Sequence, residues 1–126
     1  MTESMQKLIS ELGALVRADE RCRALEAAVD AYERSEDLNA LISEYNVQQN
    51  LLADSVGQGN ETVREAVQGR IDTLYDMIKD HPVYRNYEEA KTAFDALTNE
   101  LWGELQYAVT GQRPCSHDCS TCAGCH

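Results

Sequence analysis

The end of the chain holds the residues whose types and spacing most clearly predict chemistry. Four cysteines follow the pattern Cys-x3-Cys-x2-Cys-x2-Cys, and they are Cys115, Cys119, Cys122 and Cys125. Thiolates two or three residues apart can converge on one metal centre, because the short loop between them turns both sulfurs inward. We therefore predict a metal or cluster site held by these four thiolates. The imidazoles of His117 and His126 are candidate additional ligands.

The gaps between the cysteines bear on which metal they would hold. Structural zinc sites usually use two close pairs of ligands separated by a dozen or more residues, whereas the pairs are nearly fused in this tail. The gaps of three, two and two residues are those of a bacterial ferredoxin run read in reverse. This favours a [4Fe–4S] cluster. A compact Zn²⁺ site, with four thiolates or with three thiolates and one imidazole, is the alternative, and a tail without bound metal is the remaining one.

The charge of the chain is strongly acidic outside this tail. Asp and Glu outnumber Lys and Arg by 22 to 11, which gives a formal net charge of −11, and the segment from Gly111 onward contributes only Arg113 against Asp118. Proteins bind nucleic acids largely by placing Lys and Arg on the phosphates. We therefore expect no direct nucleic-acid binding, and any link to RNA should run through a partner protein.

The first residues of the sequence show no targeting segment. Charges at Glu3, Lys7 and Glu11 interrupt the apolar positions, so neither a signal-peptide core nor a membrane span is present there. We expect a cytoplasmic protein without membrane insertion. Thiols stay reduced in that compartment, which favours metal binding over disulfides. The fifth cysteine, Cys22, lies on an apolar helical stripe, and we expect it to be a small buried hydrophobe rather than a remote ligand.

The rest of the chain has the apolar period of three and four that predicts helices. The expected helical segments are 5–16, 19 to about 34, 35 to about 56, 63–78 and 82–111, with GQGN at 57–60 as a loop. The spacing leaves open whether the chain breaks or continues as one rod near Ser35. His81 precedes Pro82 and is expected to stop a helix. The predicted fold is all-α, an antiparallel helical hairpin or bundle followed by a short cysteine-rich tail.

Long helices in a chain of only 126 residues cannot cover all of each other's apolar surface. Dimerisation, or pairing with a similar helical partner, would cover this surface. No acid–base or nucleophile set is recognisable among the helical residues, so we predict a protein that is not an enzyme.

Several segments together resemble the YlbF/YmcA family of small helical bacterial regulators. They are the stretch LISEYNVQQNLL, the GQGN loop and the segment HPVYRNYEEAKTAFDALTNEL, within about residues 5–110. The tail PCSHDCSTCAGCH is similar to the cysteine-rich ending of a subset of that family. The resemblance divides the chain into a helical YlbF-like domain, 1–110, and a metal- or cluster-binding tail, 111–126.

The resemblance implies an antiparallel helical bundle that forms a homodimer or pairs with a paralogue. It also implies a complex with YmcA- and YaaT-like proteins that carries [4Fe–4S] clusters, influences competence, sporulation and biofilm formation, and assists RNase Y in RNA processing. The cysteines of the tail would then be cluster ligands, and the helices would supply the docking surface. We expect a regulatory adaptor. A zinc-stapled interaction module is the second hypothesis, and a small electron carrier is the third.

Overall fold

The computed structural model describes residues 1–55 and 61–112, and these residues form five α-helices without a strand. The helices are α1 (Glu3–Ala18), α2 (Glu20–Arg34), α3 (Glu36–Ser55), α4 (Glu61–Asp80) and α5 (Pro82–Thr110). The all-α prediction is confirmed. The GQGN loop and most of the cysteine-rich tail lie outside the described residues.

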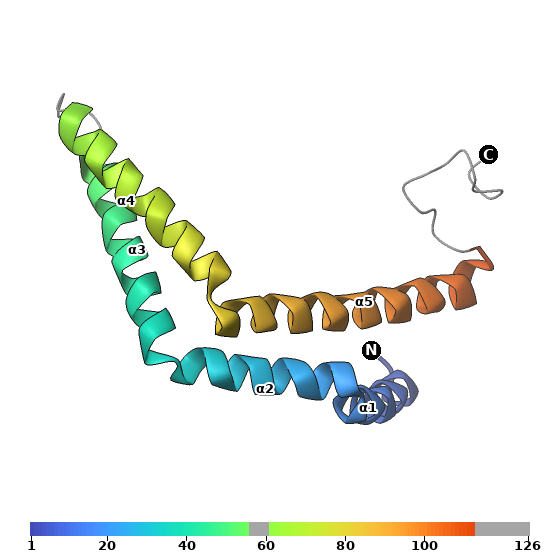
Figure 1. Ribbon diagram of the computed structural model, residues 1–126. Helices are drawn as coiled ribbons and strands as arrows, with labels where there is room; N and C mark the ends of the chain where they lie inside the picture. The colour runs from blue at the N-terminus through green and yellow to red at the C-terminus, as the bar shows by residue number, and fades with distance from the viewer. Residues whose placement is uncertain (56–60, 113–126) are drawn as a thin grey trace.

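The helices α2, α3, α4 and α5 are arranged as two antiparallel pairs. α2 packs along α5, and α3 packs along α4, so that the two pairs form the arms of an open V (Figure 1). The arms meet where α2 passes into α3 and α4 passes into α5, and we call this junction the elbow. α1 stands at the far end of the α2–α5 arm (Figure 1). α3 and α4 form the predicted antiparallel hairpin, and α2 and α5 form a second antiparallel pair.

The helix is interrupted at Ser35, so α2 and α3 are two helices and not one continuous rod. Ser35 has an extended backbone (φ −74°, ψ 102°), and its hydroxyl accepts a 3.4 Å hydrogen bond from the backbone N–H of Leu38. The amide of Asn39 donates to the carbonyls of Tyr32 and Glu33 at 3.2 and 3.1 Å. These bonds satisfy carbonyls that the last turn of α2 leaves without helical partners.

Side chains and backbone geometry also define the other helix ends. Thr2 caps α1, and Asp19 caps α2 by accepting a 2.8 Å bond from the N–H of Arg21. Pro82 occupies the first turn of α5, where its missing N–H costs nothing. Gly111 ends α5 in the left-handed region at φ 72°, and its N–H donates to the carbonyl of Tyr107 at 2.8 Å. The proline and glycine ends predicted from the sequence are confirmed.

The buried core is small because each long helix packs mainly against one neighbour. The buried apolar residues are Ala28, Leu38, Ile71, Leu74, Ile78 and Leu97. Val63 and Leu105 follow the apolar period of the segments predicted as helices at 63–78 and 82–111, but they are exposed instead. Val63 lies toward the free end of its arm, and Leu105 lies beyond Glu100, the residue of α5 that faces the start of α2. The apolar period identifies a helix face but not how far the neighbouring helix extends along it.

We expect the V to depend on its few enclosed side chains. Replacing the fully buried Leu74 by Ala should lower the free energy of unfolding by about 2–5 kcal/mol, because a cavity would open between α4 and its neighbours. The same substitution at the exposed Leu51 should change it by only about 0.5 kcal/mol. Urea unfolding at one fixed protein concentration measures both. Equal effects of the two substitutions would contradict this assignment of the core.

Candidate protein-interaction surfaces

The predicted metal ligands fall outside the part of the chain that the structure describes. This applies to all four tail cysteines and to both tail histidines, which are Cys115, Cys119, Cys122, Cys125, His117 and His126. Within residues 1–55 and 61–112, no group of three or more His, Cys, Asp or Glu side chains could hold a metal ion. Cys22 is half-buried rather than enclosed, and its Sγ lies 3.9 Å from Oε1 of Glu26. The metal site therefore stays a prediction from spacing.

A histidine joins three helices at the elbow. Nδ1 of His81 accepts a 3.2 Å hydrogen bond from the backbone N–H of Val83, which caps the start of α5. Because Nδ1 accepts, the neutral ring carries its proton on Nε2, which lies 3.0 Å from Oδ2 of Asp37 in the first turn of α3. The His81 side chain is 14% exposed. From the sequence His81 was expected only to stop a helix, and its bond to Asp37 was not foreseen.

Asp37 is held as a carboxylate by the groups around it. The hydrogen bond from His81 is the largest cause that lowers the pKa of Asp37, to about 2. The hydroxyl of Ser35, whose oxygen lies 2.7 Å from Oδ1 of Asp37, and the N–H of Leu38 lower it further. The residue that ends α2, the first turn of α3 and the α4–α5 junction are thus tied together by polar contacts. These contacts bear on the angle between the two arms.

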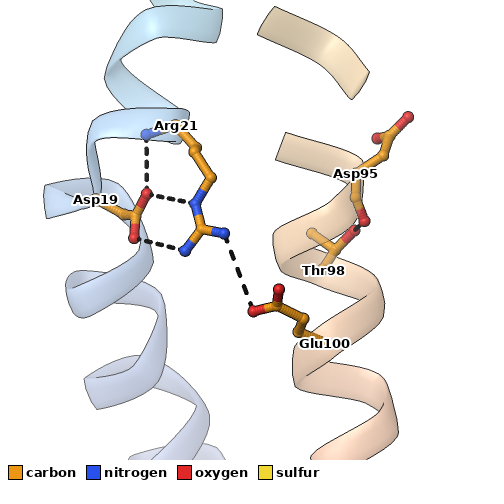
Figure 2. Close-up of polar contacts among 5 residues, drawn as sticks. All are labelled: Asp19, Arg21, Asp95, Thr98 and Glu100. Atoms are coloured by element: carbon orange, nitrogen blue, oxygen red, sulfur yellow. Dashed lines mark hydrogen bonds and ion pairs between the residues drawn. The ribbon is translucent and has the colours of Figure 1, made fainter. Parts of the chain in front are cut away.

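Arginines link the helices within each arm. Arg21 is bound to the cap residue Asp19 through Nε–Oδ1 and Nη2–Oδ2 contacts of 3.1 and 3.2 Å, and its Nη1 reaches Oε2 of Glu100 in α5 at 4.0 Å (Figure 2). In the other arm, Arg70 of α4 forms two bonds of 2.7 and 2.8 Å with the carboxylate of Glu44 in α3. The guanidinium groups lower the pKa of Asp19 and of Glu44. These arginines are therefore engaged within the protein.

A hollow of about 230 Å³ lies beside the elbow, and four of its eight lining residues are tyrosines. We call it the tyrosine hollow, and its lining residues are Tyr32, Ile42, Tyr45, Asn46, Tyr75, Ile78, Lys79 and Tyr84. The ring of Tyr32 stacks in tilted fashion on those of Tyr84 and Tyr87, with centroids 6.3 and 5.2 Å apart. Burial raises the pKa of Tyr84, so its phenol stays neutral. Tyrosine offers an apolar ring and a hydrogen-bonding tip, which suits protein recognition.

A second hollow, on α3, α4 and the elbow, contains groups that are chemically reactive in other settings. Its lining includes Thr73, Asp80 and His81. The Thr73 hydroxyl donates to the carbonyl of Gly69 at 3.0 Å, and both ring nitrogens of His81 are occupied by Val83 and Asp37. A histidine that acts as a base needs a free ring nitrogen within reach of the nucleophile. The contacts of His81 therefore cap α5 and tie it to α3 rather than activate a nucleophile.

The lowered pKa of Asp37 makes elbow stability depend on acid pH. The pKa of Asp37 is about 2 in the folded chain against an ordinary value of 3.8, so the unfolded chain binds more protons between these values. The stabilisation is present above about pH 4 and is lost as the pH falls toward about 2. Urea titrations across this range measure how the free energy of unfolding changes with pH. This free energy should fall less steeply for Asp37→Asn than for the wild type, and the two slopes should differ by up to about one proton per chain. Equal slopes would show that Asp37 is not the group responsible.

Comparison with known proteins places the fold in a family. The family model described as "Control of competence regulator ComK, YlbF/YmcA" matches residues 5–110, a range that covers nearly all of the five helices. No curated protein and no solved structure matched the chain. No helix in the described residues is long and apolar enough to cross a bilayer. The resemblance seen in the sequence is confirmed for the helical part, and the match ends before the cysteines. The chain belongs to the YlbF/YmcA family of competence-control regulators.

Proposed function

We propose that the protein is a non-enzymatic regulatory adaptor that works by binding other proteins. The observation that carries the proposal is the distribution of apolar side chains. In the described residues fifteen large hydrophobic side chains are exposed, against six buried hydrophobic residues. Exposed apolar surface on this scale is typical of proteins that complete their packing with a partner. The family match supports a regulatory role for such a scaffold.

The partners that the family resemblance suggests are paralogous YmcA- and YaaT-like proteins, in a complex that supports RNase Y-dependent RNA processing and developmental regulation. The acidic charge supports a role within such a complex that leaves RNA contact to another subunit. The net charge is −11, and Arg21, Arg70 and Lys91 each contact a carboxylate of the same chain. Phosphates would have to compete with these internal contacts. We therefore propose cytoplasmic docking onto proteins rather than onto RNA.

The cysteine-rich tail would add a cofactor to this scaffold. We propose that Cys115, Cys119, Cys122 and Cys125 bind a [4Fe–4S] cluster, with His117 and His126 as flanking or substitute ligands. The support is the spacing of the thiolates, since a cluster accepts ligands spread along a short loop. Cluster binding would link partner association to iron or redox status. The alternative is Zn²⁺ on the same thiolates, which would order the tail without redox chemistry.

Replacing the four tail cysteines by serine tests the cofactor and its purpose together. After anaerobic purification, the untagged wild-type chain should be brown, with a broad absorption band and iron matched by sulfide. The fourfold variant should be colourless and should bind the YmcA- and YaaT-like partners at least about 10-fold more weakly. Cys22→Ser is the matched control, because it removes a thiol outside the tail, and it should change neither property.

The outcomes separate the hypotheses. A colourless wild type with about one zinc per chain would replace the cluster by the structural alternative. A fourfold variant that keeps both its metal and its partners would contradict the role proposed for the tail.

A further inference from the structure

α1 carries an apolar face that remains open in the described chain. None of its residues is buried, and Met5, Leu8, Ile9, Leu12 and Leu15 are between 38% and 71% exposed. A Cβ built on Gly13 would meet nothing within 4 Å, so the middle of the helix has open space beside it. Helices of this length derive most of their stability in water from packing an apolar face. The face of α1 is therefore expected to be covered by something outside the described residues.

The spacing on this face is that of a coiled-coil seam. Met5, Leu8, Leu12 and Leu15 are separated by three, four and three residues, which are the a and d positions of a heptad repeat. These gaps read the same in both directions. Two antiparallel copies of α1 would therefore place Met5 opposite Leu15 and Leu8 opposite Leu12, so that each a position meets a d position. The seam is complementary to itself.

The charges of α1 also suit a second copy of the chain. Glu3 and Glu11 balance Lys7 and Arg17, so the helix is neutral, whereas the whole chain carries −11. Two copies can approach through α1 with less repulsion than through the acidic surfaces elsewhere. Helices that lie on membranes usually have an excess of Lys and Arg on their polar face, and α1 has none. The charge pattern thus favours a protein helix over an anionic bilayer.

We propose that two copies of this chain pair through α1, seam against seam, as an antiparallel two-helix coil. The proposal rests on the partner-dependent packing proposed above and assigns the homodimer contact to one surface. The Asp19–Arg21 contacts fix the junction at which α1 leaves α2, and the Arg21–Glu100 contact ties this junction to α5. α1 stands at the end of the arm opposite the elbow (Figure 1). Pairing there leaves the tyrosine hollow of each copy open to a different partner.

A charge-pair experiment on the full-length chain tests both the surface and its direction. Leu8→Glu alone and Leu12→Lys alone should each raise the dissociation constant of the dimer about 100-fold or more, since a charge would face an apolar seam. An equal mixture of the two variants should pair again. In an antiparallel pair the new carboxylate at position 8 meets the new ammonium at position 12, and the remaining leucines meet each other. Anaerobic sedimentation equilibrium measures all four samples, including the wild type.

Controls keep the outcome decisive. Leu51→Glu places the same charge on an exposed leucine of α3 and should leave the dimer intact. Far-UV circular dichroism should show that the variants keep most of their helix, and pairing in the mixture would show that both variant chains are competent to associate. Dimers that survive Leu8→Glu, or variants that fail to pair when mixed, would overturn the proposal.

Two further results bear on the proposal and on the proposed function separately. A monomeric wild type that binds vesicles of phosphatidylcholine and phosphatidylglycerol would assign α1 to a membrane surface and overturn the proposal. Metal content and binding of YmcA- and YaaT-like partners should be unchanged in Leu8→Glu. Loss of the dimer with both retained supports α1 as the homodimer surface, whereas a dimer that persists overturns this surface alone and leaves the adaptor function standing.

Discussion

The packing of helices in pairs is the constraint on which the rest of this structure depends. Each long helix packs mainly against one neighbour, so each amphipathic face meets a single partner along only part of its length. A helix enclosed in a four-helix bundle contacts two neighbours and buries a wider stripe. The V consequently encloses few side chains and leaves many apolar side chains exposed. An adaptor needs such surface, and a single stable core would remove it.

The same constraint explains the polar character of the elbow. Side chains of both arms meet at the elbow, and directed hydrogen bonds there contribute to the angle between the arms. Ser35 and Asn39 satisfy the break between α2 and α3, while His81 caps α5 and bonds Asp37 across the junction. Histidine is a common active-site residue, but both ring nitrogens of His81 make hydrogen bonds within the fold. These bonds stabilise the elbow, beside which the tyrosine hollow lies.

The helices could be predicted closely because their limits are local. Caps, Pro82 and Gly111 act within a few residues, and the apolar period marks each packed face. The exposure of Leu105 could not be predicted, because it depends on where α2 begins relative to α5. The bond between Asp37 and His81 joins residues 44 positions apart, and only the folded elbow brings them together. The role of the tail cysteines, in contrast, is inferred from spacing alone, so the proposed cluster rests on chemistry rather than on described geometry.

The central claim is that the open helical faces are used for association. Hydrogen exchange of the full chain, measured anaerobically by mass spectrometry alone and with a YmcA- or YaaT-like partner, tests it most directly. Partner binding should slow exchange in the segments that line the tyrosine hollow, in α2–α3 and α4–α5, and α1 should gain protection as the chain concentration rises. Unchanged exchange in all of these segments, at every concentration and with the partner bound, would contradict the account.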